Sequence, residues 1–437
     1  MKTNQDVLLI VAVAFVLRIS FVGLLHVRGY TSDENEYLSL ATKLSEGKEF
    51  VDSNGEWSTK APLWPFVLSV LFRVVGSGLL VPHLLGCLLG AFAVYLVFRL
   101  CVELLEDRFV ALIAASLLAV YPSLIVYSDI LQSEAMYIVF VLIAFLFLER
   151  TRSKPTMLNA ALLGVFAAGA TLTRAVFFGF FIFLLLFGAW MFREKYQRYG
   201  TKLLMSAGVW VILLAPWTIR NYNVHSTFVP ISSWGGMSLL LGNNPYSTGT
   251  WSTKPGFEEW FATKAKENGI DLAHSTEIQR SALGRKVALE FITSEPVDAA
   301  KLALKKFYIH WIYPISNSDS NTRLQAICVA GDVLLYMLGG IGLIVIGEKR
   351  RSFLPIFAAI VFFTALQVIM HCEARYRLPI MPFVAMLSAI GASVLIDTRR
   401  LKEFWQIQKY KVAIASWVVA VCCVYAFTAW QFLSGKI

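Results

Sequence analysis

The run VLLIVAVAFVLRISFVGLL occupies residues 7–25, and the polar segment Tyr30-Thr31-Ser32-Asp33-Glu34-Asn35-Glu36-Tyr37 follows it after a short link. An apolar run of this length can cross about 30 Å of hydrocarbon as a helix. Arg18 interrupts the run and no small-residue cleavage site follows it, so we interpret it as a membrane span and not as a cleavable signal. Asp33 and Glu34 are therefore predicted to lie at a membrane surface.

Similar apolar runs recur along the chain. Of its 437 residues, 57% are hydrophobic and only 16% are charged, which is more apolar surface than a soluble domain can bury. Because only helices satisfy their backbone hydrogen bonds within one segment in lipid, we predict an all-α polytopic membrane protein. Its eleven predicted spans are residues 7–25, 82–101, 109–126, 134–148, 157–173, 175–192, 203–218, 327–346, 353–370, 379–396 and 412–431.

Segment 62–77 is apolar but short, begins with Pro62 and Pro65, and contains Arg73. We predict an interfacial or re-entrant helix there and not a span. With the N-terminus inside, the short basic loops then face the cytoplasm, as the positive-inside rule expects, and only the acidic loop 102–108 is an exception. The basic residues of these loops run from Arg150 to Lys154, Arg193 to Lys202, Lys349 to Arg351 and Arg399 to Lys411.

The same topology places outside the membrane residues 26–81, 127–133, a hairpin tip near Arg174, 219–326 and 371–378. Loop 219–326 is too long for a connector and has helical stretches near 256–267 and 275–312. We therefore predict a catalytic membrane module (1–218), an extracytoplasmic subdomain (219–326) and C-terminal membrane helices (327–437). The net charge of +10 is assigned to cytoplasmic loops, so no nucleic-acid partner is expected, and the six cysteines are interpreted as core residues.

Asp33 and Glu34 open a predicted interfacial helix over 33–47. Thr31 followed by Glu34 fits a capping box, and Gly47 can end the helix. In one interpretation the two carboxylates only cap this helix. In the other, the helix N-terminus keeps Asp33 ionised, and Asp33 takes a proton from a hydroxyl as a general base. The two roles are compatible.

Other acidic and basic residues gather on the same predicted face. Lys60, before a proline-started helix, can bind a phosphate or reach the interface as a snorkelling lysine. Asp129 and Glu134 can complete an acidic site beside Asp33 or cap the next helix.

Several arginines complete the candidate set. Arg174 needs an anionic partner at its hairpin tip, for which a lipid phosphate or Asp33 would serve. Arg220 is either a substrate contact or a headgroup anchor beside Trp217. Arg375 and Arg377 flank Tyr376 and suit a phosphate whose lipid tail enters the bilayer, unless they form a plain basic loop. Further candidate substrate contacts are Glu34, His371, Glu373 and Tyr376, and His371 and Glu373 are also weak candidate metal ligands. No cofactor is certain, although a divalent metal near Asp33 and Asp129 is possible.

Taken in order, these motifs resemble the protein O-mannosyltransferase and aminoarabinose-transferase superfamily, the C-type (GT-C) membrane glycosyltransferases. The resemblance covers nearly the whole chain. It rests on Asp33-Glu34 with Tyr37, Thr59-Lys60-Ala61-Pro62, Pro216-Trp217 with Arg220-Asn221, Gly242-Asn243-Asn244 and Glu373-Ala374-Arg375-Tyr376-Arg377-Leu378-Pro379.

The resemblance implies a GT-C fold, a polyprenyl-phosphate sugar donor and an inverting transfer to a lipid, glycan or protein at the outer face of a bacterial inner membrane. It implies Asp33 as base, Lys60 at the donor phosphate, Asp129 as the second acid, and Arg375 and Arg377 as further phosphate contacts. Two features depart from the family pattern. Asp129 and Glu134 are not an adjacent pair, and no extended soluble domain follows the last span, so loop 219–326 and the membrane cavity are expected to recognise the acceptor.

Three other functions remain open. A transporter of lipid or polyol would show internal symmetry and broken helices near the bilayer midplane. A ligase or polymerase would take a pyrophosphate-linked glycan and would not need the early Asp33-Glu34 pair. A scaffold protein would have no use for ordered charges on one face.

Overall fold

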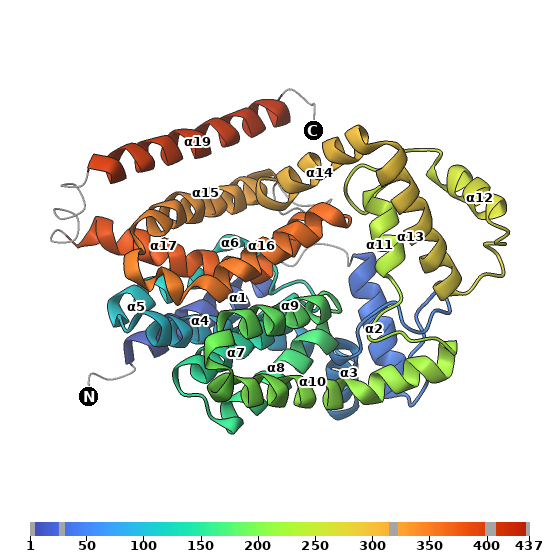
Figure 1. Ribbon diagram of the computed structural model, residues 1–437, viewed down its shortest axis with the longest axis horizontal. Helices are drawn as coiled ribbons and strands as arrows, with labels where there is room; N and C mark the ends of the chain where they lie inside the picture. The colour runs from blue at the N-terminus through green and yellow to red at the C-terminus, as the bar shows by residue number, and fades with distance from the viewer. Residues whose placement is uncertain (1–4, 26–30, 314–321, 398–407, 434–437) are drawn as a thin grey trace.

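The computed structural model describes residues 5–25, 31–313, 322–397 and 408–433. Figure 1 shows long helices lying roughly side by side along the long axis, with a smaller group of helices at one end. Apart from one isolated bridge between Ser247 and Thr253, the described residues form helices, turns and loops. The all-α prediction is confirmed.

Each predicted span overlaps an observed helix. These helices are α1 (Gln5–Leu25), α4 (Leu80–Leu105), α5 (Arg108–Ala119), α6 (Pro122–Val126), α7 (Glu134–Ser153), α8 (Met157–Thr173), α9 (Val176–Met191), α10 (Tyr196–His225), α15 (Thr322–Val345), α16 (Leu354–Ile369), α17 (Met381–Ile396) and α19 (Gln408–Leu433). Among the described residues, five segments are long and apolar enough to cross a membrane alone: Gln5–Leu24, Leu80–Leu105, Arg193–His225, Thr322–Val345 and Ala374–Ile396. The chain is a multi-pass membrane protein, and the count of eleven spans stays a prediction.

Two spans differ from their predicted form. Residues 109–126 form two helices, because Pro122 has no N–H for a continuing helix and Tyr121 before it is extended. Helix α10 continues to His225, past the predicted end at 218, despite Pro216 inside it. The first residues of the predicted segment 219–326 therefore belong to helix α10.

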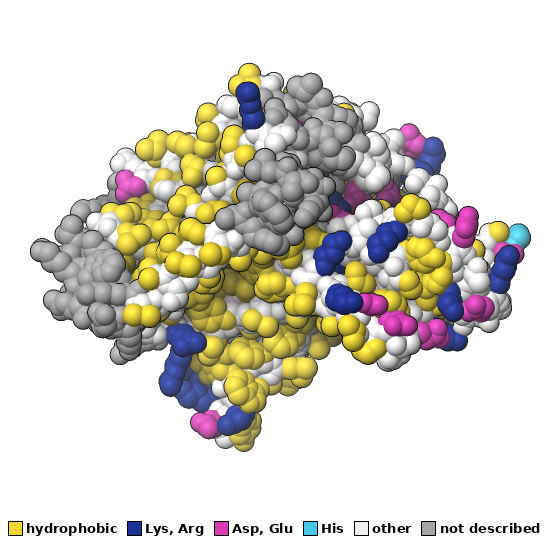
Figure 2. Space-filling model, turned by 90° about the horizontal axis from the view of Figure 1, so that it is seen from above, with side chains coloured by type: hydrophobic (Ala, Val, Ile, Leu, Met, Phe, Trp, Pro, Cys, Tyr) yellow, Lys and Arg dark blue, Asp and Glu magenta, His cyan; other side chains and the backbone are white. Residues whose placement is uncertain are grey.

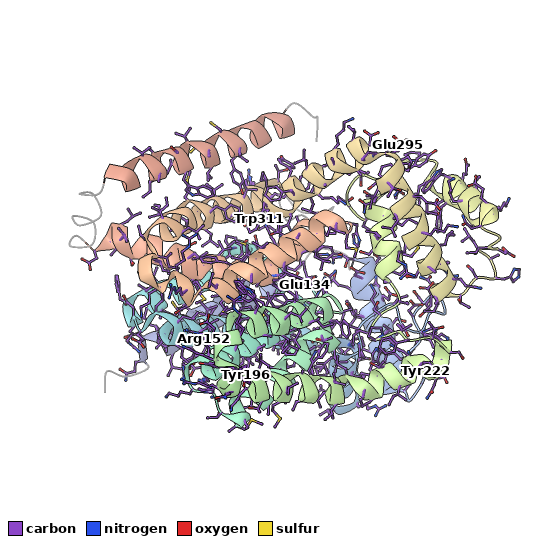
Figure 3. The ribbon with its side chains drawn as sticks, in the orientation of Figure 1. Glu134, Arg152, Tyr196, Tyr222, Glu295 and Trp311 are labelled. Atoms are coloured by element: carbon purple, nitrogen blue, oxygen red, sulfur yellow. The ribbon has the colours of Figure 1, made fainter. Side chains whose placement is uncertain are left out.

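One end of the bundle carries the predicted cytoplasmic loops. Arg108 pairs with Asp6 of α1 at 3.1 Å, and Arg150 pairs with Glu103 at 2.6 Å. The Arg152 guanidinium donates to Ser352 Oγ at 3.2 Å, which joins α7 to the start of α16. Figure 3 shows Arg152 and Tyr196 toward this end, and Tyr222 and Glu295 toward the other. The predicted basic loop 399–411 lies mostly outside the described residues.

The sides of the bundle are apolar. Figure 2 shows a broad hydrophobic surface over the helices, with acidic and basic side chains gathered over the subdomain at the right. Exposed apolar residues of the bundle helices include Leu9, Leu186, Leu204, Ile212 and Val361. Such a large exposed apolar area is what a lipid-facing surface requires.

The opposite end carries the subdomain, built from α11 (Gly235–Gly242), α12 (Phe257–Glu267), α13 (Glu277–Ser294) and α14 (Pro296–Trp311). Its small core includes Leu240, Phe261 and Leu283. The predicted helical stretch 275–312 is two helices that meet at Pro296. Helix α11 was not predicted. It packs so closely on α13 that a Cβ at Gly236 would lie 1.8 Å from the Ser281 carbonyl oxygen.

Both predicted interfacial helices are present, as α2 (Ser32–Ser45) and α3 (Leu63–Val75). They share a small core that includes Ala41, Trp64 and Leu68. Arg73 near the end of α3 donates to the carbonyls of Leu44 and Ser45 and so caps the end of α2. This packing fixes the direction of α2, whose first turn points into the bundle.

Candidate active site

The two acidic residues in the first turn of α2, Asp33 and Glu34, have different roles. Thr31 and Glu34 form the predicted capping box: the Glu34 N–H donates to Thr31 Oγ1 (3.3 Å), and the Thr31 N–H donates to Glu34 Oε2 (2.9 Å). Glu34 is fully buried, and its Oε1 also accepts from the Leu131 N–H at 2.9 Å. Glu34 therefore positions α2, whereas Asp33 keeps a partly exposed side chain that lines a cavity.

Asp33 lies between two cations. Lys60 Nζ is 2.8 Å from Asp33 Oδ1, and an Arg375 nitrogen is 2.7 Å from Oδ2. Lys60 also pairs with Glu36 at 3.1 Å, and Arg375 donates to the side-chain oxygen of Gln132. Residues from α2, the 59–62 segment and the 371–380 segment thus meet at one carboxylate, and the predicted neighbourhood of Asp33, Lys60 and Arg375 is observed.

These charges set the protonation states of the cluster. Burial by itself would raise the pKa of Asp33, but the charges of Lys60 and Arg375 outweigh it and hold that pKa well below its usual range. Burial would lower the pKa of Lys60, yet the surrounding acidic groups raise it above its usual value. Burial raises the pKa of Glu36, because the ion pair with Lys60, which Asp33 also uses, offsets the effect of burial only in part. Asp33 is therefore fully ionised at neutral pH.

A second ion pair lies beside the first. Arg174, at the end of α8, pairs with Glu134, the first residue of α7, at 2.6 Å. Its guanidinium lies 5.3 Å from the ring centre of Tyr376 and 5.9 Å from that of Tyr137. The hairpin arginine thus has an anionic partner within the protein, and that partner is Glu134 and not Asp33, which the sequence suggested.

His371 joins the 371–380 segment to the subdomain. Its Nδ1 lies 2.8 Å from Ser238 Oγ, and its Nε2 lies 3.1 Å from the Tyr376 hydroxyl. Burial lowers the pKa of His371 to about 4. The ring is therefore neutral at pH 7 and orders the wall of the cavity without adding charge.

A cavity of about 450 Å³ connects these groups. Its charged wall contains Asp33, Lys60, Glu134, Arg174 and Arg375, and an uncharged wall contains Trp234, Ser238, Trp251 and His371. Apolar residues of α9 and α16 line the part between the membrane helices, namely Val176, Phe178, Gly179, Phe362, Phe363 and Leu366. Figure 1 shows α9 and α16 alongside each other near α2 and α11. The cavity therefore has two parts. One is charged and contains Asp33, and the other, the apolar slot, lies between α9 and α16.

Two predicted site residues lie elsewhere. Asp129 is 2% exposed and lies 3.6 Å from His83, so it is not the cavity-lining acid beside Asp33 that the sequence suggested. Arg220 donates to the carbonyls of Phe50 and Trp57 at 2.8 and 2.7 Å, and it is an anchor of the first external loop. Its guanidinium also lies 4.7 Å from the Trp217 ring centre.

The polar residues of the 371–380 segment lie in different surroundings. Arg377 is fully buried, pairs with Asp332 at 2.5 Å and donates to the Tyr313 carbonyl at 2.8 Å. It is absent from the cavity wall, so the expectation that it contacts a donor phosphate needs correction. Glu373 accepts from the Trp251 N–H at 2.9 Å and holds the loop that carries this tryptophan.

The residues around Asp33 do not form a metal site. In the described ranges no three His, Cys, Asp or Glu side chains converge. Both Asp33 oxygens already accept bonds from cationic side chains, and the predicted second acid, Asp129, lies outside the cavity. This set of side chains does not fit a divalent cation.

Sequence reasoning missed several residues that line or support the cavity. Glu36 is the next residue but one after Glu34, and its spacing from Asp33 on α2 was a usable signal. Gln132, Ser238, Trp234 and Trp251 carry no motif, and only the approach of the subdomain to the 371–373 segment brings the last three to the site. That approach is made by backbone hydrogen bonds, from His371 N to Ser238 O (3.0 Å) and from Cys372 N to Gly249 O (2.8 Å).

Residues 11–223 match the family model described as "Dolichyl-phosphate-mannose-protein mannosyltransferase". This region contains α2, Lys60, Glu134 and Arg174, but not the 371–380 segment. No curated protein sequence matches the chain.

Solved structures show a similar fold. The oligosaccharyltransferase AglB of Archaeoglobus fulgidus, in complex with an inhibitory peptide and a dolichol-phosphate, is 15% identical with a TM-score of 0.55. In its apo form the values are 16% and 0.56. In both cases the alignment covers 97% of this chain and 55% of the other, so the chain spans about half the length of that enzyme. ArnT of Cupriavidus metallidurans, bound to undecaprenyl phosphate, is 14% identical over 89% of this chain and 78% of that chain, with a TM-score of 0.45, too low to support an argument.

Proposed function

We propose that this chain is a membrane glycosyltransferase of the GT-C superfamily that transfers a monosaccharide from a polyprenyl-phosphate donor to a hydroxyl acceptor. The reaction takes place at the subdomain end of the bundle, which in the predicted topology is the periplasmic face of the bacterial inner membrane. The acceptor is a lipid, a glycan or a protein. The transfer inverts the anomeric centre.

One observation carries this proposal. An ionised carboxylate, Asp33, is held by Lys60 and Arg375 in a cavity that continues into an apolar slot between α9 and α16. A lipid-linked sugar phosphate has the matching parts, which are a polar sugar, an anionic phosphate and an apolar tail. The cations suit the phosphate, and the slot suits the first part of the tail.

Asp33 acts as the general base. Its carboxylate takes the proton from the acceptor hydroxyl while the hydroxyl oxygen bonds to the anomeric carbon of the sugar. In the structure two cations hold its pKa low, which makes it a weak base. When the donor phosphate binds, it competes for Lys60 and Arg375, and the pKa of Asp33 returns toward its usual value. Donor binding thereby strengthens the base.

The cations act on the leaving group. As the new bond forms, the bond between the anomeric carbon and the phosphate oxygen breaks, and the polyprenyl phosphate leaves with one more negative charge. Lys60, Arg174 and Arg375 line the cavity where this charge develops. Preorganised cations in a site shielded from water stabilise such charge strongly. No nucleotide is needed, because the lipid phosphate is itself the leaving group.

Sugar transfer by the purified protein in detergent tests the proposal. The donors are synthetic polyprenyl-phosphate monosaccharides, and wild type is compared with Asp33→Asn. We expect wild type to consume a donor and Asp33→Asn to lose about 10²–10⁴-fold in rate. Glu46→Gln is the matched control, because Glu46 follows the same helix and its side chain is 49% exposed beside Lys48.

The rival functions predict other results. A ligase would consume only pyrophosphate-linked glycans, and a transporter would move lipid in vesicles without breaking the sugar–phosphate bond. If wild type consumes no monosaccharide phosphate donor, the proposal is wrong. Equal rates for wild type and Asp33→Asn would show that Asp33 only caps helix α2 and is not the base.

A further inference from the structure

We propose that the uncharged wall of the cavity binds the sugar ring of the donor and selects a sugar without a positive charge. We define the uncharged wall as Trp234, Ser238, Trp251 and His371, all of which line the cavity. The inference rests on the proposed function and names the class of sugar that the same site accepts.

The wall presents an ordered aromatic surface. The rings of Trp234 and Trp251 stack with their centres 5.6 Å apart at 24°, and His371 meets Trp251 edge-on at 5.8 Å and 67°. Trp251 is nevertheless 54% exposed. The face of an aromatic ring is electron-rich and attracts polarised C–H groups. The C–H face of a pyranose ring is a suitable partner for such a surface.

Trp251 is held in place by its backbone. Its N–H donates to Glu373 Oε1 at 2.9 Å, and the neighbouring Gly249 carbonyl accepts from the Cys372 N–H at 2.8 Å. Gly249 has a φ of +88°, which a side chain would strain. A loop fixed in this way presents its tryptophan without a large ordering cost on binding. An exposed aromatic ring in a mobile loop would not have this advantage.

The wall lies directly beside the cations. The Tyr376 hydroxyl bonds to His371, while its ring lies 5.3 Å from the Arg174 guanidinium and 5.5 Å from that of Arg375. One side chain therefore separates the uncharged wall from the groups proposed to bind phosphate. Because the donor sugar is joined to the phosphate by a single oxygen, a phosphate at these cations places the sugar at this wall.

The charges of the cavity exclude a cationic sugar. None of the four residues of the uncharged wall is acidic, and Tyr376 connects this wall to two cations, Arg174 and Arg375. His371 is neutral. An ammonium group on a sugar at this wall would lie near these two cations with no carboxylate of the wall to pair with, and a buried charge without a partner is costly.

Two matched donors test the selection. They are a polyprenyl-phosphate hexose and the same molecule with one hydroxyl replaced by an amine, assayed with the full-length protein in detergent. We expect kcat/KM for the neutral donor to be higher by at least about 30-fold, in line with the cost of an unpaired buried charge. Equal or better use of the amino donor would overturn the inference and leave the proposed function intact.

Variants of Trp251 test the wall. We expect Trp251→Ala to raise the donor KM by about 10-fold or more and Trp251→Phe by less than about 3-fold, because a smaller ring keeps part of the stacking. Trp190→Ala, an exposed tryptophan on α9, is the control. Calorimetry of donor binding, with each tryptophan variant made in the inactive Asp33→Asn protein, gives the same comparison of donor affinity without turnover.

The outcomes separate the two proposals. If Trp251→Ala leaves donor binding unchanged, or weakens only the KM of the acceptor, the wall does not hold the donor sugar and the inference is wrong. If no lipid-phosphate sugar of either charge is bound or consumed by wild type, the proposed function itself fails.

Discussion

Two arginines in one short segment, Arg375 and Arg377, have the same type of partner and opposite surroundings. Arg375 pairs with Asp33 at 2.7 Å, and these side chains are 21% and 30% exposed. Arg377 pairs with Asp332 at 2.5 Å, and these are 0% and 1% exposed. The first pair faces a cavity that a substrate can enter, and the second is sealed between α15 and the 371–380 segment.

This difference in exposure indicates which of the two ion pairs takes part in the reaction. A buried ion pair gives little net stability, but breaking it strands a charge in the interior. A cavity pair can exchange a protein partner for a substrate group at low cost. We therefore assign the Arg377 pair to the fold and the Arg375 pair to the reaction. The following variants break or sharpen that contrast.

The largest effect on stability is expected for Asp332→Ala. It leaves Arg377 buried beside the Tyr121 hydroxyl and two carbonyls without an anionic partner. We expect a loss of about 3–5 kcal/mol, measured by thermal unfolding in detergent. Asp298→Ala, which removes a surface pair with Lys301, is the control and should cost under about 1 kcal/mol. Unchanged unfolding of Asp332→Ala would contradict a structural role for the Arg377 pair.

Arg375→Met should separate activity from stability. Loss of a cation where leaving-group charge develops should lower the transfer rate by about 10²-fold. Because the pair is partly solvated, we expect the free energy of unfolding to change by no more than about 1 kcal/mol. Steady-state kinetics and thermal unfolding of the same preparation provide the check. A variant that unfolds easily but retains its rate per folded molecule would place Arg375 with the structural pair.

A smaller, pH-dependent effect is expected from His371. Its pKa of about 4 lies below the unfolded value, so between roughly pH 4 and 6.5 the unfolded chain binds more protons and stability rises with pH. Acidification from pH 7 to 5 should therefore destabilise wild type more than His371→Gln, by a difference on the order of 1 kcal/mol. Parallel unfolding curves at the two pH values measure this. An identical loss in both proteins would show that His371 is not the group responsible.

The smallest effect is expected for Glu36→Gln. Glu36 shares Lys60 with Asp33 at 3.1 Å but does not line the cavity. Its loss should leave Lys60 on Asp33 and change the transfer rate by less than about 5-fold, measured by steady-state kinetics. A loss as large as that of Asp33→Asn would make Glu36 a second candidate base.

The sequence predicted the helices well because their signal is local. Apolar runs found α8, α9 and α16 within one or two residues, and the Thr31–Glu34 spacing predicted a capping box that the structure contains. It failed where a proline divides a predicted helical segment, at Pro122 and Pro296. Periodicity alone cannot show whether a helix restarts on the far side of such a break.

The candidate site was predicted in part. Asp33, Lys60 and Arg375 were recognised from motif order, and they meet in the structure. Arg375 and Arg377 look alike in sequence, because only the distant Asp332 of α15 decides that the second is sealed. The aromatic wall has no local signal either, since Trp234 and Trp251 reach the site through backbone contacts with the 371–373 segment.

The most direct test compares Asp33→Asn with Asp332→Asn in one experiment, measuring both the initial rate of transfer from a polyprenyl-phosphate sugar and the unfolding temperature. The account predicts that Asp33→Asn unfolds near wild type but loses about 10²-fold or more in rate. It predicts that Asp332→Asn unfolds earlier but keeps its rate per folded molecule. Retained transfer by a folded Asp33→Asn protein would contradict the assignment of the cavity pair to catalysis.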